Sequence, residues 1–124
     1  MTSVLPLRFR VALVAPPLWP INTVAPVVTG TASVGFTLTT SNGTWVSDGA
    51  ITYTYQWCYA LLNDAGAVLT DESGKPLGEP ISGGTASTYV VQAGDIGGFI
   101  FCVVIATNAG GSSSADSNMV GPIT

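Results

Sequence analysis

Residues 97–108 read GGFIFCVVIATN, and this stretch says more about the fold than any other in the chain. Eight apolar residues, 99–106, follow one another without a polar break, between a pair of glycines and a threonine-asparagine pair. A strand with one wet face alternates apolar and polar residues, whereas a continuous apolar run between turn residues is typical of a strand covered on both faces. The chain has 124 residues, which suffice for one domain with a single core. The stretch therefore raises the question of what covers its second face.

The rest of the chain reads as short strands separated by turns. Glycine (15) and proline (8) punctuate segments rich in Val, Thr and Ser, and no segment sustains a helical period. Seven or so short strands, repeated at intervals of roughly 8–12 residues with turns between them, are typical of an all-β sandwich. Residues 33–40, SVGFTLTT, predict a strand with Val34, Phe36 and Leu38 on one face. Residues 115–123 predict the last strand, after a turn at 109–114.

Charge excludes several classes of partner. The chain carries 3 basic and 7 acidic residues, a net charge of −4, so it lacks the clustered Lys and Arg that phosphate binding needs, and we expect no nucleic-acid partner. Arg8 and Arg10 lie in an apolar N-terminal arm, residues 1–21, whereas all the acidic residues follow it. No apolar run approaches the roughly 20 residues of a membrane span. The run VALVA (11–15) after Met1 is shorter than the ~7–15 residue apolar segment of a signal peptide. We expect neither a membrane span nor a signal peptide.

The residues of common active sites are missing from the sequence. The chain contains no histidine, which removes the usual general base, the Ser-His-Asp triad and most zinc sites. Asp71 and Glu72 are adjacent and would point to opposite sides of an extended chain, and with Asp64 they do not form an EF-hand pattern. Asp95 is expected to cap a turn by accepting backbone N–H groups. We therefore predict no enzyme activity, no cofactor and no metal site.

Four segments, in the same order, resemble the immunoglobulin-like repeat of bacterial surface proteins and tailed-phage structural (virion) proteins. They are NTVAPVVTGTASVGFTLTTSNGTW (22–45), YTYQW (53–57), ISGGTASTYVVQAGDIGG (81–98) and VVIATNAGGSSSADS (103–117). The resemblance implies an immunoglobulin-like β-sandwich over residues 22–124, with an insertion at about 60–80. The arm over residues 1–21 lies outside the repeat. Such modules act as spacers, decorations and adhesion units, so the fold alone does not specify the function.

The resemblance also implies the direction of individual side chains. Trp57 is expected to fill the core between the sheets, and Val104 to point inward. Because side chains alternate along a strand, Ile100 and Cys102 then also point inward, whereas Cys58 points outward. Cysteines on opposite faces of a sheet cannot meet the disulfide geometry, in which the Cβ atoms lie about 4 Å apart. We therefore expect two free thiols, as suits a protein folded in a reducing cytoplasm.

The same alternation sends four large apolar side chains to the outer face of this strand: Phe99, Phe101, Val103 and Ile105. Burying each of them fully is worth about 1.5–3 kcal/mol, so a wet face here would be costly and prone to aggregation. Three groups can cover it: the arm, a neighbouring subunit, or the insertion folded back through Tyr59, Leu61 and Leu62. We expect the arm or a neighbour, which makes this face an interface. The arm residues predicted to make contacts are Leu5, Leu7, Phe9, Val11, Leu13 and Trp19.

These expectations favour a non-enzymatic virion structural protein of a bacteriophage. The chain would be a capsid decoration or head-surface protein, anchored by its arm to capsid proteins or neighbouring subunits and made in the host cytoplasm; a homo-oligomer is compatible with this. The alternative is a tail- or fibre-associated adhesion module that binds a host-surface glycan, with the insertion at its tip. The aromatic candidates for stacking on sugar are Trp19, Trp45, Tyr59 and Tyr89. Trp45 lies within a segment of the repeat and is expected to pack at the edge of the core rather than bind sugar.

Overall fold

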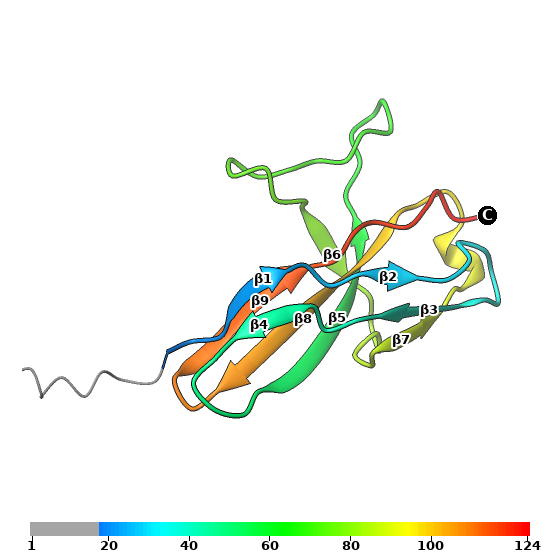
Figure 1. Cartoon of the computed structure of the whole chain (residues 1–124). Coiled ribbons are helices and arrows are strands. Elements are labelled where there is room, and N and C mark those ends of the chain that lie inside the picture. Colours follow the sequence, from blue (N-terminus) through cyan, green and yellow to red (C-terminus); the bar gives the residue numbers. More distant parts are fainter. Residues whose placement is uncertain (1–17) are drawn as a thin grey trace, which may run out of the picture.

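The computed structural model describes residues 18–124, which form an all-β sandwich (Figure 1). Five of the predicted arm contacts, Leu5, Leu7, Phe9, Val11 and Leu13, lie outside the described residues. The elements within 18–124 are β1 (Ile21–Val24), β2 (Val28–Thr29), β3 (Thr37–Thr40), β4 (Thr44–Val46), β5 (Thr52–Ala60), β6 (Gly78–Pro80), β7 (Thr88–Val90), the 3-10 turn η1 (Ala93–Asp95), β8 (Ile100–Asn108) and β9 (Gly111–Asp116).

One layer is a four-stranded antiparallel sheet in the order β6-β5-β8-β9. Its centre is the pair β5-β8, in which Trp57 lies opposite Cys102 and Cys58 opposite Phe101. Both strands are nine residues long and rich in β-branched and aromatic side chains, which suit a pleated, half-buried surface. All of the apolar stretch except Phe99 thus lies on β8, which runs between β5 and β9 and pairs with β9 from Val103 onward.

The other layer consists of a three-stranded sheet, β2-β3-β7, and a two-stranded ribbon, β1-β4. They are two parts of one antiparallel pair, because residues 21–29 run alongside residues 37–46 through both. Pro26 lies at the break in the first strand, where its missing N–H cannot join a ladder. Gly43 lies at the break in the second and has a φ of +77°, which favours glycine. These two breaks account for nine short strands where seven or so were predicted.

The main core lies between the layers and is centred on Trp57, which is fully buried. Its indole N–H donates to the Ala86 carbonyl at 2.7 Å, and its ring stacks on Tyr89 with 5.8 Å between the centroids. The other buried members of this core are Val28, Leu38, Ile81, Val91, Ile100, Cys102, Val104 and Ile123. The inward direction predicted for Trp57 and for alternate residues of β8 is confirmed. Cys58 and Cys102 are free thiols, also as predicted.

Two strand predictions are corrected. Of the strand expected over residues 33–40, only Thr37–Thr40 pairs as β3, because a turn bonded from the Phe36 N–H to the Ser33 carbonyl (3.1 Å) precedes it. Phe36 and Val34, which were predicted to share a face with Leu38, are therefore exposed, and Phe36 has 53% of its surface exposed. The last strand begins earlier than expected, at Gly111, because the serines after it pair in register with the end of β8.

Candidate functional site

The outer face of β8 is covered at one end by the chain itself. Phe101 is 2% exposed and forms a second apolar cluster with Cys58 and Ala60. Val68 from the insertion and Met119 from the C-terminal segment pack against this cluster. The expectation that the arm or a neighbouring subunit covers Phe101 is therefore corrected. The insertion folds back over this ring, although through a different side chain from those expected.

The other end of this outer face is more open. Val103 and Ile105 are half-buried, and Ile105 lies between Thr54 of β5 and Ser114 of β9 across the sheet. Phe99 is half-buried and packs against the second cluster. The predicted outer-face interface thereby loses Phe101, since this buried ring has almost no surface to offer a partner. Val103 also packs against the second cluster, so Ile105 is the member of the predicted set that lies outside that cluster.

The insertion is a tandem repeat of eight residues, LNDAGAVL (62–69) followed by TDESGKPL (70–77). Each repeat folds as a tight turn in which the side chain of its second residue, Asn63 or Asp71, accepts backbone N–H bonds from two and four residues on, at 2.9 and 3.0 Å. The hydrogen bond from the Ser73 hydroxyl is the main reason that the pKa of Asp71 lies below its usual value. The recurring pattern, Asn or Asp three residues before Gly and six before Leu, was visible in the sequence but missed.

One ion pair ties the insertion to the sheet. Lys75 Nζ lies 3.8 Å from Asp116 Oδ1, and the Asp116 side chain is only 11% exposed. Among the described residues, nothing donates a hydrogen bond to either oxygen of this carboxylate. Burial raises the pKa of Asp116 and outweighs the opposing effect of Lys75. The ion pair therefore links the insertion to β9, and the Asp116 carboxylate beneath the insertion is poorly solvated.

Exposed apolar side chains gather where the arm joins the sandwich. This arm-root surface comprises Leu18, Trp19, Ile21, Val24 and Val46, with exposed fractions between 44% and 63%. The chain is anchored here, because the Leu18 N–H donates to an Asp48 carboxylate oxygen at 2.7 Å and the Asn108 amide donates to the Leu18 carbonyl at 2.6 Å. The predicted contact residue Trp19 lies against Gly111, where a Cβ would come within 3.0 Å of the indole nitrogen.

The arm-root surface adjoins an unpaired strand edge. Among the strands of residues 18–124, β4 pairs with β1 alone, and β7 pairs with β3 only over Thr37–Thr39. Ile21 and Val46 lie opposite each other across the ribbon, and each is half exposed. An open edge with apolar side chains on its face is a template for the addition of another strand.

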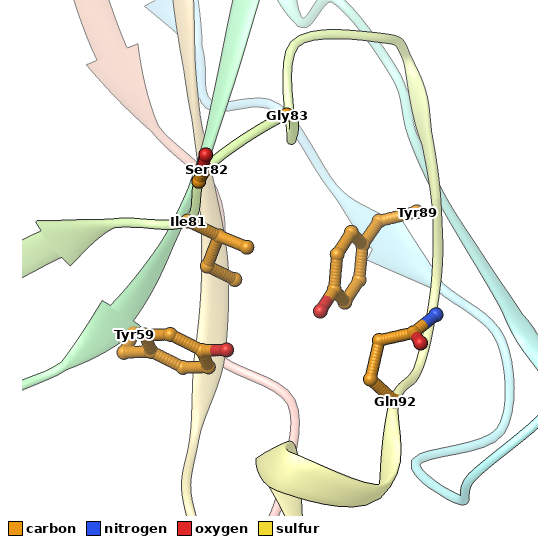
Figure 2. A pocket seen from close by; sticks show the side chains of 6 residues that line it. All are labelled: Tyr59, Ile81, Ser82, Gly83, Tyr89 and Gln92. Carbon is orange, nitrogen blue, oxygen red and sulfur yellow. The ribbon is translucent and has the colours of Figure 1, made fainter.

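A hollow of about 560 Å³ opens between the end of β5 and the start of β7 (Figure 2). We call it the tyrosine hollow; its lining residues are Tyr59, Ile81, Ser82, Gly83, Tyr89 and Gln92. Figure 2 shows both tyrosine hydroxyls directed toward the middle of the hollow. Tyr59 and Tyr89, which the sequence offered as separate sugar-stacking candidates, are therefore brought together, whereas Trp19 lies apart from them at the arm root.

Asp95 holds the two tyrosines in place. Its carboxylate is buried and accepts hydrogen bonds from the Tyr59 hydroxyl (2.7 Å), the Tyr89 hydroxyl (2.7 Å) and the Gln92 N–H (2.8 Å). The predicted turn cap is thus confirmed, with two additional donors that the sequence did not indicate. The hydrogen bond to Asp95 raises the pKa of Tyr59, and burial, followed by the same carboxylate, raises the pKa of Tyr89. Both hydroxyls stay protonated at neutral pH.

The remaining candidates have structural surroundings. Trp45 packs against the main core and donates from its indole N–H to the Asn42 carbonyl at 2.7 Å, as core-edge packing predicts. Within residues 18–124, no group of three His, Cys, Asp or Glu side chains is arranged to hold a metal ion. The same part of the chain has no helix long and apolar enough to cross a membrane.

Comparisons of the chain with protein-family models, with curated proteins and with solved structures gave no match. Three features of the described residues can engage a partner: the arm-root surface with its open edge, the tyrosine hollow, and the open end of the outer face of β8.

Proposed function

We propose that this chain is a non-enzymatic structural module of a bacteriophage virion, a decoration or head-surface protein that attaches to other virion proteins through its arm and the arm-root surface. The observation that carries this proposal is the gathering of exposed apolar side chains around Trp19, which is 63% exposed at the point where the arm leaves the sandwich. Apolar patches on a protein surface mark interaction sites, and Ile21 and Val46 lie side by side in this one.

The distribution of charge supports an attachment at this end. Arg8 and Arg10 lie in the arm, whereas the rest of the chain has one lysine and seven carboxylates. A basic apolar segment can pair with the acidic surface of a neighbouring copy or of another virion protein, and the open edge of β4 offers backbone groups to it. The virion setting itself rests on the resemblance to repeats of phage structural proteins.

The proposal is tested with full-length chains that carry Ile21→Lys and Val46→Lys, produced in cells that assemble the particles. Both side chains are half exposed, so the substitutions should change folding stability by no more than about 0.5 kcal/mol each. We expect the amount of chain that co-purifies with particles to fall at least tenfold. A shortened chain without residues 1–17, which keeps the anchored residues Leu18–Pro20, should behave in the same way.

Val90→Lys is the matched control, because Val90 is 47% exposed but lies on β7, away from the arm root. It should leave incorporation unchanged. Circular dichroism and the unfolding midpoint should be the same for all variants. If the Ile21 and Val46 variants enter particles as well as the control does, the arm-root surface is not the attachment site and the proposal is refuted.

A further inference from the structure

We propose that the tyrosine hollow binds an uncharged sugar ring, a neutral hexopyranose at the end of or within a glycan chain. This inference goes beyond the proposed virion function and does not depend on it, since it concerns a different part of the molecule. It rests on the rigidity of the two tyrosines, on the kind of hydrogen-bonding groups that the hollow presents, and on the charge near it.

The hollow is preorganised. Ligand sites typically have volumes of about 300–1,000 Å³ and combine aromatic walls with a few placed polar groups, and the hollow of about 560 Å³ fits this description. Asp95 fixes the hydroxyl ends of Tyr59 and Tyr89, while Trp57 supports the Tyr89 ring from behind. Side chains that are already held in one geometry lose little entropy when a ligand binds.

The polar groups of the hollow mainly accept hydrogen bonds. The hydroxyl protons of Tyr59 and Tyr89 are committed to Asp95, so their oxygens are left to accept. The amide nitrogen of Gln92 donates to the Val90 carbonyl at 2.8 Å, which orients this side chain at the edge of the hollow. The Ser82 hydroxyl lies on the rim and can do both. A ligand with several hydroxyl donors and an apolar ring face matches this set.

The surrounding charge excludes an acidic ligand. In the part of the chain that the structure describes, the side chains that line the hollow carry no charge. The buried Asp95 carboxylate lies directly behind the tyrosines, and no cation of residues 18–124 forms an ion pair with it. A uronic or sialic acid would meet this negative charge without any compensating Lys or Arg. A neutral hexose avoids that repulsion.

The test is a titration of the full chain, observed by NMR through its backbone amides, with methyl glucoside, methyl galactoside, N-acetylglucosamine and glucuronate as separate probes. We expect at least one neutral sugar to shift the amide signals of residues 81–84 and 88–92 in a saturable way, and glucuronate not to shift them. Removing one hydrogen-bonding group by Ser82→Ala or Gln92→Ala should weaken binding about 3- to 10-fold.

Both of these side chains are exposed, so the variants should fold normally, and Ser114→Ala on the outer face of β9 is the matched control that should bind like the unchanged chain. The inference is overturned if no neutral sugar shifts these signals at 50 mM, or if the Ser82 and Gln92 variants bind like the control. It is equally overturned if glucuronate binds as well as the neutral sugars.

Discussion

Replacing Gly78 with alanine tests whether the second face of β8 is covered by the chain itself. A Cβ at this position would lie 2.5 Å from Cζ and 2.9 Å from Cε1 of Phe101, and 3.2 Å from Cβ of Cys58. The Phe101 ring is buried between Cys58, Val68 and Met119, so it cannot swing away. Overpacking of this kind costs about 1–3 kcal/mol. We expect Gly78→Ala to destabilise the fold by that amount.

Gly94→Ala is the matched control, because a Cβ there meets nothing within 4 Å. It should be neutral, or stabilising by about 0.4–1 kcal/mol through the unfolded state. Phe101→Leu alone should lower the free energy of unfolding by about 1–2 kcal/mol. The double variant Gly78→Ala/Phe101→Leu should be about 1–2 kcal/mol more stable than the sum of the two single effects, because the smaller side chain makes room for the new methyl group.

These free energies are measured by urea unfolding followed through tryptophan fluorescence, at two protein concentrations. The structure predicts the same midpoints at both, because the cover over Phe101 belongs to the same chain. If Gly78→Ala behaves like Gly94→Ala, the ring is not held against β6. If its effect depends on protein concentration, a neighbouring subunit covers the ring and our assignment of the insertion is refuted.

Three further predictions concern buried polar groups. Asp116→Asn should stabilise the fold, because burial raises the pKa of this carboxyl group. In the unchanged chain, the contribution of Asp116 to stability should be complete below pH 3.8 and should be lost as the pH rises through its higher folded pKa. Unfolding midpoints of the two chains between pH 3 and 7 check both statements, and a contribution of Asp116 that grows as the pH rises would contradict the assignment. Asp95→Ala should lower the free energy of unfolding by at least about 3 kcal/mol, since three hydrogen bonds to a charged group are lost and each is worth about 1.5–3 kcal/mol. A thermal unfolding scan measures this loss, and a value below about 1 kcal/mol would contradict the prediction. Burial raises the pKa of Cys102 to about 12 and also raises the pKa of Cys58. Iodoacetamide at pH 8 should therefore label both thiols at least a hundredfold more slowly in the folded chain than in urea, and rapid labelling of Cys102 would contradict its burial.

Several features could be read from the sequence because they depend on local pattern. The alternation of side chains along β5 and β8 follows from the pleat of a strand. Once the resemblance placed Trp57 and Val104 inward, this alternation placed Cys58 and Phe101 outward. The cap at Asp95 follows from short-range hydrogen bonds within a tight turn. Pro26 divides the first strand into β1 and β2, since a strand that lacks one N–H cannot continue its ladder.

Other features depend on which segments meet in space, and periodicity carries no information about that. Residues 97–108 by themselves predicted a strand covered on both faces, but neither the segment that provides the cover nor its restriction to one end of the strand. The Val68 side chain reaches the Phe101 cluster only because the two eight-residue turns bring the chain back to the sheet, and Lys75 meets Asp116 for the same reason. Likewise, Tyr59 and Tyr89 share one carboxylate because the two layers close on each other. A strand's pleat sets the direction of each side chain, whereas the neighbour it meets is set by the packing of distant segments, which only the folded chain brings together.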